Sequence, residues 1–188
     1  MRSTITRFAL ALTLIAGGVV HAATTKLPVV AEKSSIGFHG EKIVGSHDGT
    51  FGKFDGSVTV DGQKPTAVEF TIDLSTVKTD SGRLDGHLKS ADFFDVANHP
   101  NATFKSSSVK DLGNGEYEVS GLFTLRGATN PVSFRAKTER AGGEVRVRSD
   151  FKIDRQKWGV AYKGAPDNLI KDDVEIKLDL TFPAPAAK

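Results

Sequence analysis

Histidine side chains are the first candidates for acid–base or metal chemistry in this sequence. Four of the five histidines follow residue 22, namely His39, His47, His87 and His99. Their spacing contains no His-Glu-x-x-His motif, which would place two zinc ligands on one helix face. The chain also has no cysteine, which excludes a thiolate nucleophile and a cysteine-based metal site. We therefore predict no catalytic residue and no metal site; an active site assembled from distant loops is the alternative.

Glycine-rich motifs for phosphate or acyl chemistry are also missing from the sequence. There is no Gly-x-Ser-x-Gly nucleophile elbow and no Walker-type loop. The stretch from Gly49 to Gly52 is too short for such a loop, so we interpret it as a strand bulge. The motifs therefore predict no cofactor.

The charge balance gives no sign of a nucleic-acid partner. The chain has 25 Lys and Arg against 23 Asp and Glu, a formal charge of +2. The first 22 residues contribute Arg2 and Arg7 and no acid, which leaves 23 basic residues against the 23 acidic ones. A neutral, mixed surface lacks the basic patch that binds phosphate backbones.

The first 22 residues have the pattern of a signal peptide. Arg2 and Arg7 precede an apolar stretch from Phe8 to Val20, and Ala22 is the expected cleavage position. The apolar stretch is shorter than the roughly 20 residues that span a bilayer. We expect export to the periplasm, cleavage of this segment and no stable membrane anchor; a retained anchor is the alternative.

The elements that would position any binding residue are predominantly β-strands. Apolar and polar residues alternate with period two in many segments, which places one face of each strand in a core. Four segments alternate strongly and four more weakly: residues 68–75, 117–126, 145–153 and 174–182, and Ser35–Ile43, Gly52–Asp61, Ala102–Lys110 and Val132–Glu139. One further segment, between Thr79 and Asn98, instead has Leu84, Leu88 and Ala91 at helical spacing.

Turn dipeptides join several of these strands as hairpins. Asp61-Gly62, Asn114-Gly115 and Gly142-Gly143 each lie between alternating segments and tolerate a positive φ. Short turns connect antiparallel neighbours, whereas parallel strands need longer crossovers. The predicted fold class is all-β, an antiparallel β-barrel of about eight strands, with a two-sheet sandwich as the alternative. The inserted helical segment would cover one end of the barrel.

Several motifs, in order along the chain, resemble the YceI-like family. They are residues 79–95 with His99-Pro100 and Thr103-Phe104, residues 49–56, residues 121–127 with Pro131, Asp154-Arg155 with Trp158-Gly159, and Asp172-Asp173-Val174. The resemblance implies a lipocalin-like barrel over residues 23–183 that binds a polyisoprenoid or a similar lipid. Residues 184–188, rich in Pro and Ala, are predicted to form a disordered tail.

The resemblance implies that apolar side chains inside the barrel hold the lipid chain. The candidates lie on the expected inner face, in the helical segment or near the family motifs: Phe38, Phe70, Ile72, Leu88, Phe93, Phe94, Phe104, Val119, Phe123, Val147, Phe151 and Trp158. Such a site depends on burial of apolar area, at about 25 cal/mol per Å², and needs no polar constellation. Core packing is the alternative for all of them, because alternation does not distinguish a hollow barrel from a filled one.

Three polar residues are candidates for contact with a lipid head group. Arg83 and His87 are four residues apart and would share a helix face. In the alternative interpretation His87 bonds a loop and Arg83 is solvated. The third candidate is Arg155, whose alternative role is an ion pair with Asp172 or Asp173 that fixes the register of the last strand against the first. A carboxylate-paired arginine is less available to a phosphate, so these roles compete.

The sequence therefore predicts a periplasmic binding or carrier protein, not an enzyme, that holds an isoprenoid-like lipid or a quinone inside the barrel. No other cofactor is expected. The alternative is a stress or interaction protein with a filled barrel, which binds a protein partner through its loops. A lipid-modifying enzyme is a third hypothesis. The resemblance also allows pairing into a homodimer.

Overall fold

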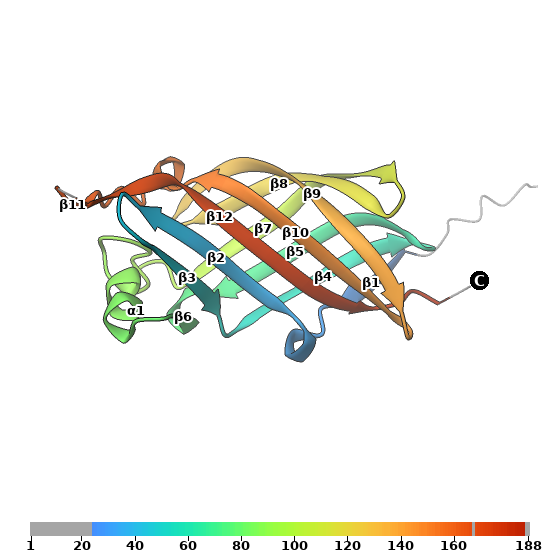
Figure 1. Ribbon diagram of the computed structural model, residues 1–188. Helices are drawn as coiled ribbons and strands as arrows, with labels where there is room; N and C mark the ends of the chain where they lie inside the picture. The colour runs from blue at the N-terminus through green and yellow to red at the C-terminus, as the bar shows by residue number, and fades with distance from the viewer. Residues whose placement is uncertain (1–23, 167, 187–188) are drawn as a thin grey trace, which may run out of the picture.

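The computed structural model describes residues 24–166 and 168–186 as one antiparallel sheet rolled into a barrel (Figure 1). The predicted signal peptide, residues 1–22, and the last two residues of the predicted tail lie outside the described residues. The strands are β1 (Thr24–Pro28), β2 (Ser35–Lys42), β3 (Ser46–Phe51), β4 (Phe54–Asp61), β5 (Lys64–Asp73), β6 (Val77–Thr79), β7 (Asn101–Gly113), β8 (Glu116–Leu125), β9 (Ala128–Ala141), β10 (Glu144–Asp154), β11 (Gly164–Ala165) and β12 (Asn168–Pro183). The helix α1 (Gly82–Lys89) and the short 3-10 helices η1 (Ala31–Lys33), η2 (Leu74–Thr76) and η3 (Arg155–Trp158) complete the described elements.

The sheet closes because its last long strand pairs with an early one. The strand order is β1-β4-β5-β7-β8-β9-β10-β12-β2-β3-β6, and β11 pairs with β12. β12 thus lies between β10 and β2, with Asp179 opposite Ser35. Two residues after β3, the chain continues as β4, so a short connection links strands that lie next to the two opposite edges of the path. The N–H groups of Val29 and Val30 bond Gly56 and Thr181, linking β4 to β12.

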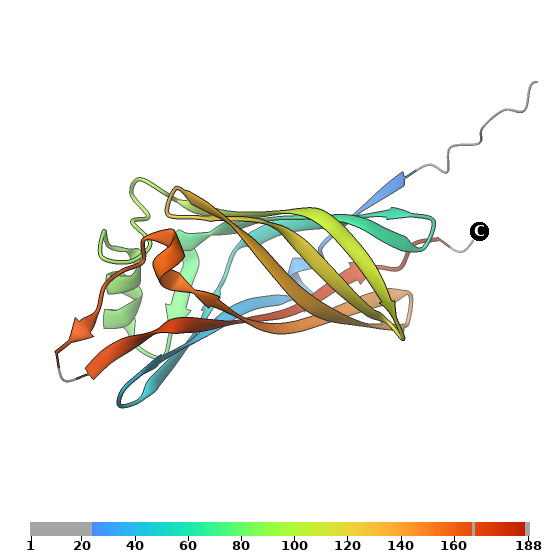
Figure 2. The same cartoon turned by 90° about the horizontal axis from the view of Figure 1, so that it is seen from above.

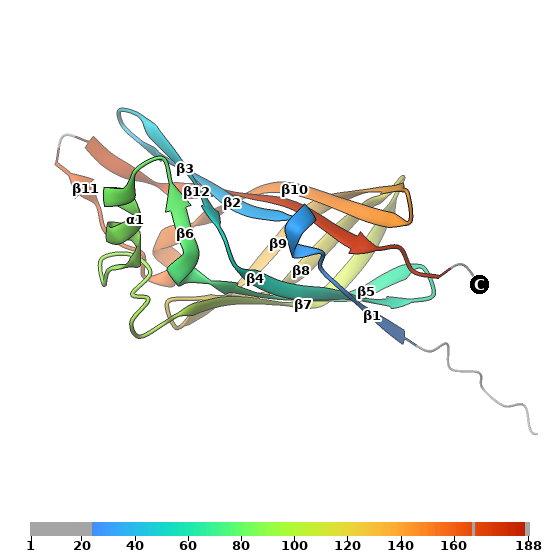
Figure 3. The same cartoon turned by 90° about the horizontal axis from the view of Figure 1, so that it is seen from below.

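The barrel has two distinct ends (Figures 2 and 3). One end carries α1, β6, β11 and the β2–β3 hairpin, and we call it the α1 end. The other carries the β4–β5, β7–β8 and β9–β10 turns together with β1 and the end of β12, and we call it the far end. Ala184, in the predicted tail, donates its N–H to Gly143 O at the far end (2.8 Å).

The predicted all-β, antiparallel fold class is confirmed, and each of the eight expected strands corresponds to a strand of the barrel. The structure adds β1, β3, β6 and β11, which are too short or too polar to give a clear alternation. The strand-bulge interpretation of the stretch beginning at Gly49 is wrong. Gly49 and Thr50 belong to β3 and pair regularly with Phe38 and Gly37 of β2.

The three predicted turn dipeptides lie in hairpin turns with positive φ. Asn114 and Gly115 have φ values of 54° and 77°, and Gly142 and Gly143 have values of 59° and 81°. Gly62, in the β4–β5 turn, has φ 59°. In the β7–β8 and β9–β10 turns, a positive φ at both central residues matches the right-handed twist of the flanking strands, which explains these tight connections.

α1 is shorter than the predicted helical segment, because the helix ends at Lys89 and the backbone of the next residue, Ser90, is extended. The Ser90 N–H bonds His87 O, and the chain continues through turns to residue 98. Asp85 anchors the helix: its Oδ1 accepts bonds from the Thr79 N–H (2.7 Å) and hydroxyl (2.8 Å), and Lys78 lies 3.1 Å from Oδ2. The Thr79 hydroxyl and the other donors hold the pKa of Asp85 below its ordinary value.

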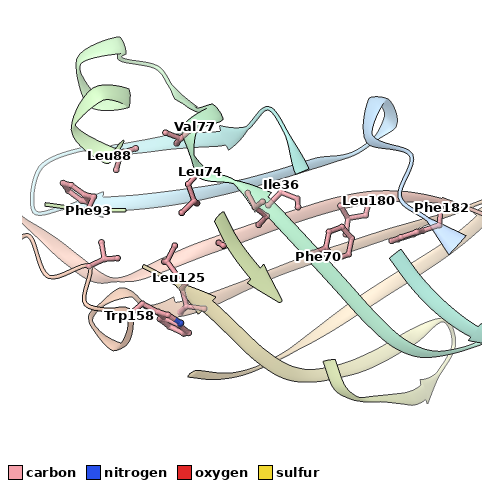
Figure 4. Close-up of a cluster of buried hydrophobic side chains, with 14 residues drawn as sticks. Ile36, Phe70, Leu74, Val77, Leu88, Phe93, Leu125, Trp158, Leu180 and Phe182 are labelled. Atoms are coloured by element: carbon pink, nitrogen blue, oxygen red, sulfur yellow. The ribbon is translucent and has the colours of Figure 1, made fainter. Parts of the chain in front are cut away.

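Buried apolar side chains connect α1 to the barrel (Figure 4). Leu88 of α1 and Phe93 of the following turn lie toward Leu74 and Val77, both of which are fully buried. Farther along the barrel, Phe70, Leu180 and Phe182 form a second group of labelled side chains, with the Phe70 and Phe182 rings edge to face at 6.3 Å. The helix thereby covers the α1 end with apolar contacts.

Candidate functional site

The barrel encloses a cavity of about 480 Å³. Volumes of roughly 300–1,000 Å³ are typical of small-molecule sites. The lining includes His87 and Tyr162 at the α1 end and Gln63 and Arg140 at the far end. Between them it consists mainly of inward side chains of β5, β8, β9, β10 and β12. The cavity therefore extends along the barrel, and its wall is apolar between two ends that carry polar groups.

Most of the apolar candidates lie in the cavity wall. They are Phe38, Phe70, Ile72, Leu88, Phe93, Phe94, Phe104, Val119, Phe123, Val147 and Phe151. Trp158 is the exception, and its expected place in the lining is wrong. It is 2% exposed in η3, donates its indole N–H to Phe123 O (2.9 Å) and packs edge-on to the Phe123 ring at 5.5 Å. Trp158 therefore contacts the lining residue Phe123 without lining the cavity itself.

Three glycines allow phenylalanine rings to pack against the barrel wall. A Cβ atom at Gly49 would lie 2.2 Å from Phe38 Cζ, and one at Gly56 would lie 2.4 Å from Phe70 Cδ1. In the same way, Gly121 faces Phe104, at 2.7 Å from Cζ. Such distances are far below the van der Waals contact of about 3.5–4.0 Å. The absence of a side chain at these glycines therefore lets the rings lie against neighbouring strands, which leaves volume in the lumen.

An aromatic cluster borders the cavity at the α1 end. The His87 ring lies edge to face with Phe93 (4.9 Å) and with Tyr162 (4.8 Å), and the last two rings are 5.2 Å apart. His87 Nε2 is 3.0 Å from Asp92 Oδ2. One imidazole nitrogen is therefore held by a loop carboxylate, as the alternative interpretation of His87 expected. Its contact with a head group stays a prediction.

Arg83 does not line the cavity, whereas His87 does. The α1 residues that line the cavity are Leu84, His87 and Leu88, which follow the i, i+3, i+4 spacing of one helix face. Arg83 lies outside this face and is exposed. The expected shared face of Arg83 and His87 is therefore not found at the cavity, because the helix presents Leu84 there instead. Contact of Arg83 with a head group stays a prediction.

Arg155 is 4% exposed and mainly holds the chain that follows it. Its guanidinium donates to the carbonyl oxygens of Val160, Ile170 (3.2 Å) and Lys171 (3.1 Å) and to Asp172 Oδ1 (3.2 Å). The predicted pair with Asp172 is confirmed, but its expected role is wrong: it joins η3 to the start of β12, not the first strand to the last. Although Arg155 borders the cavity, its donors are largely engaged.

Several polar lining residues escaped the sequence interpretation. Lys42 Nζ lies 3.2 Å from His47 Nε2 near the α1 end, and His47 Nδ1 lies 2.8 Å from Asp80 Oδ1. Arg140 lies at the far end, where the alternation that predicted a strand over 132–139 continues by one more inward position. Extending that period would have found Arg140. Tyr162 lies in a loop and has no periodic signal.

Two further findings concern metals and membranes. In residues 24–166 and 168–186, no three or more His, Asp or Glu side chains gather in a way that could hold a metal ion. Within the same described ranges, no helix has the length and apolar character needed to cross a membrane.

Comparison with known proteins identifies the family. The model of the YceI-like domain matches residues 28–182, which is most of the chain. The chain belongs to the YceI-like family. Among its relatives, the protein YceI of Salmonella newport is 37% identical over 147 residues, covering 77% of this chain and 76% of that protein. The family resemblance inferred from the motifs is therefore confirmed.

Solved structures share the barrel. BcnA of Burkholderia cenocepacia superposes with a TM-score of 0.75 at 25% identity, over 81% of this YceI-like chain and 98% of BcnA. A polyisoprenoid-binding domain from Saccharophagus degradans, implicated in plant cell wall breakdown, has a TM-score of 0.69 at 18% identity, over 85% and 98% of the two chains. The second likeness concerns the fold alone.

Proposed function

We propose that this YceI-like protein binds a long apolar lipid, of the isoprenoid or quinone type, inside its barrel and carries or stores it in the periplasm. The cavity along the barrel is the observation that carries this proposal. A chain buried there would be held by apolar contact, at about 25 cal/mol per Å² removed from water. Binding of this kind requires no covalent step and no metal.

The chemistry of the cavity supports an extended ligand. Its wall consists largely of aliphatic and phenylalanine side chains, whereas polar side chains are concentrated at the ends, with Lys42 and His47 at one and Gln63 and Arg140 at the other. An amphiphile fits such a wall with its tail inside and its polar group at an end. The polyisoprenoid-binding domain with the same fold supports an isoprenoid tail as the ligand class. The predicted signal peptide supports the periplasmic location.

The cavity also bears on the alternative of an interaction protein with a filled barrel. A filled barrel would need large side chains to meet in the lumen. Instead, Gly49, Gly56 and Gly121 let three phenylalanine rings pack against the wall. This arrangement favours a barrel that holds a ligand.

The first test is native mass spectrometry of the protein purified from its own periplasm, followed by organic extraction and identification of the lipid. We expect a stoichiometric adduct that extracts as a polyprenyl or quinone species. A mass without adduct, together with no uptake of added polyprenol, would contradict the proposal. Recovery of the mature protein from the periplasmic fraction tests the location separately.

A matched pair of substitutions on β9 tests whether the ligand occupies the lumen. Ala136 is buried and lines the cavity, whereas the adjacent Lys137 is exposed on the outer face. Ala136→Trp would fill the lumen and should abolish the adduct, and Lys137→Trp should retain it. Equal retention by both variants would place the ligand outside the barrel.

A further inference from the structure

The far end of the cavity differs chemically from its middle. The inward residues of β9 are Val132, Phe134, Ala136, Thr138 and Arg140, and all five line the cavity. The first three are apolar and the last two are polar. A strand that presents its alternate residues to one lumen thus changes from hydrocarbon to a hydroxyl and a guanidinium near the far end.

Arg140 is hydrogen-bonded across this end. Its Nη1 donates to Gln63 Oε1 and its Nη2 donates to the Gln63 backbone oxygen, both at 3.3 Å. Gln63 lies in the β4–β5 turn, and β7 and β8 separate β5 from β9 in the sheet. The contact therefore crosses the opening instead of following the wall. We call this pair the Arg140–Gln63 strut.

Other groups narrow the same opening. Tyr117 and Pro185 line the cavity there, and the bond from Ala184 N–H to Gly143 O holds the chain before Pro185 against the β9–β10 turn. Burial raises the pKa of Tyr117, with Asp111 adding to the rise and Arg140 opposing it, so the phenol is neutral near the guanidinium. A hydrocarbon chain that reaches this region meets hydrogen-bonded polar groups.

We propose that the Arg140–Gln63 strut is the end wall of the cavity and sets the longest chain that the barrel accepts. This inference rests on the proposed lipid-binding function, with the tail directed from the α1 end toward the far end. Each additional methylene group that finds apolar surface strengthens binding about fourfold. At the strut this gain stops, because further methylenes would have to displace a hydrogen-bonded guanidinium and amide.

The test measures affinity for an all-trans polyprenol series that lengthens by one isoprene unit at a time. For the wild-type chain, affinity should rise with each unit up to a limit and then level off or fall. Arg140→Ala removes both bonds of the strut, whereas Gln63→Ala removes the side-chain bond and leaves the backbone acceptor. Both residues are exposed, so the fold should tolerate either change. The limit should move to longer polyprenols in Arg140→Ala, and by less in Gln63→Ala, where one bond of the strut remains. Arg148→Ala, on the outer face of β10, is the control and should keep the wild-type limit.

The outcomes separate this inference from the proposed function. If Arg140→Ala and Gln63→Ala bind polyprenols with the same chain-length limit as the wild-type protein, the strut is not the end wall, and the proposed lipid binding is unaffected. A uniform loss of affinity at every chain length in Arg140→Ala would make Arg140 a head-group contact and also overturn the end wall. A wild-type protein that takes up no polyprenol would refute the proposed function and this inference together.

Discussion

Replacing Gly49 by alanine should reduce lipid affinity by moving one ring. The new Cβ would lie 2.2 Å from Cζ and 2.5 Å from Cε1 of Phe38, and no backbone atom is among its nearest contacts. Normal contact requires about 3.5–4.0 Å, so the ring must shift by about 1.5 Å. Gly49 belongs to the wall strand β3 and Phe38 lines the cavity, so the ring moves into the lumen.

The expected effect on binding is larger than the effect on folding. If the displaced ring excludes about two methylene groups of a bound chain, the loss is about 1.6 kcal/mol, or about 15-fold in Kd. An off-rotamer ring costs about 1 kcal/mol of stability, and replacement of glycine by alanine in a strand returns about half of that. Polyprenol titration and urea unfolding of the same preparations separate the two quantities.

Two further variants make this prediction specific. Gly52→Ala is the control, because its Cβ would meet only Thr76 at 3.6 Å or more, an ordinary contact. Phe38→Leu in the Gly49→Ala background removes the displaced ring and should restore most of the affinity. An unchanged affinity in Gly49→Ala, or a loss that Phe38→Leu does not relieve, would refute the idea that glycine keeps the lumen open.

Three other perturbations have defined outcomes. Arg155→Met should destabilise the fold by about 3 kcal/mol in urea unfolding, because the carbonyl groups of Val160, Ile170 and Lys171 lose their donor; a change below about 1 kcal/mol would contradict this. The lowered pKa of Asp85 stabilises the fold above the pKa of an unfolded aspartate, about 3.9, and this stability is lost as pH falls through the lower folded value. Asp85→Asn should therefore flatten the acid limb of the stability profile, and an unchanged limb would contradict the role of Thr79 as its donor. Trp158→Phe should lower stability by about 1 kcal/mol through the lost bond to Phe123 O, with lipid affinity nearly unchanged; a large loss of affinity would make Trp158 a ligand contact.

The long strands and their turns could be predicted because each depends on local signals. The alternation in β5, β8, β10 and β12 records which face is buried, and the paired positive-φ residues at Asn114 and Gly142 record where the chain reverses. The strands β3, β6 and β11 have weaker signals because tertiary pairing, not their own pattern, holds them extended. Fold class was therefore accessible from the sequence, whereas the full strand list was not.

The hollow interior could not be predicted, because it depends on pairing between distant residues. Gly49 has its effect only because it lies opposite Phe38, and Gly56 only because it lies opposite Phe70. Neither relation is visible before the register is known. The orientation of Trp158 away from the lumen has a similar cause, since η3 turns the chain out of the strand alternation just before it.

The position of β12 between β10 and β2 determines when the molecule can finish folding. Residues 35–42 emerge early in synthesis, yet their partner strand consists of residues near the C-terminus. Such non-local pairing slows folding, since loop-closure entropy must be overcome before the contacts form. Until β12 has been synthesised, the chain cannot complete the barrel. The early strand β2 therefore has no partner on this side until the last long strand is available.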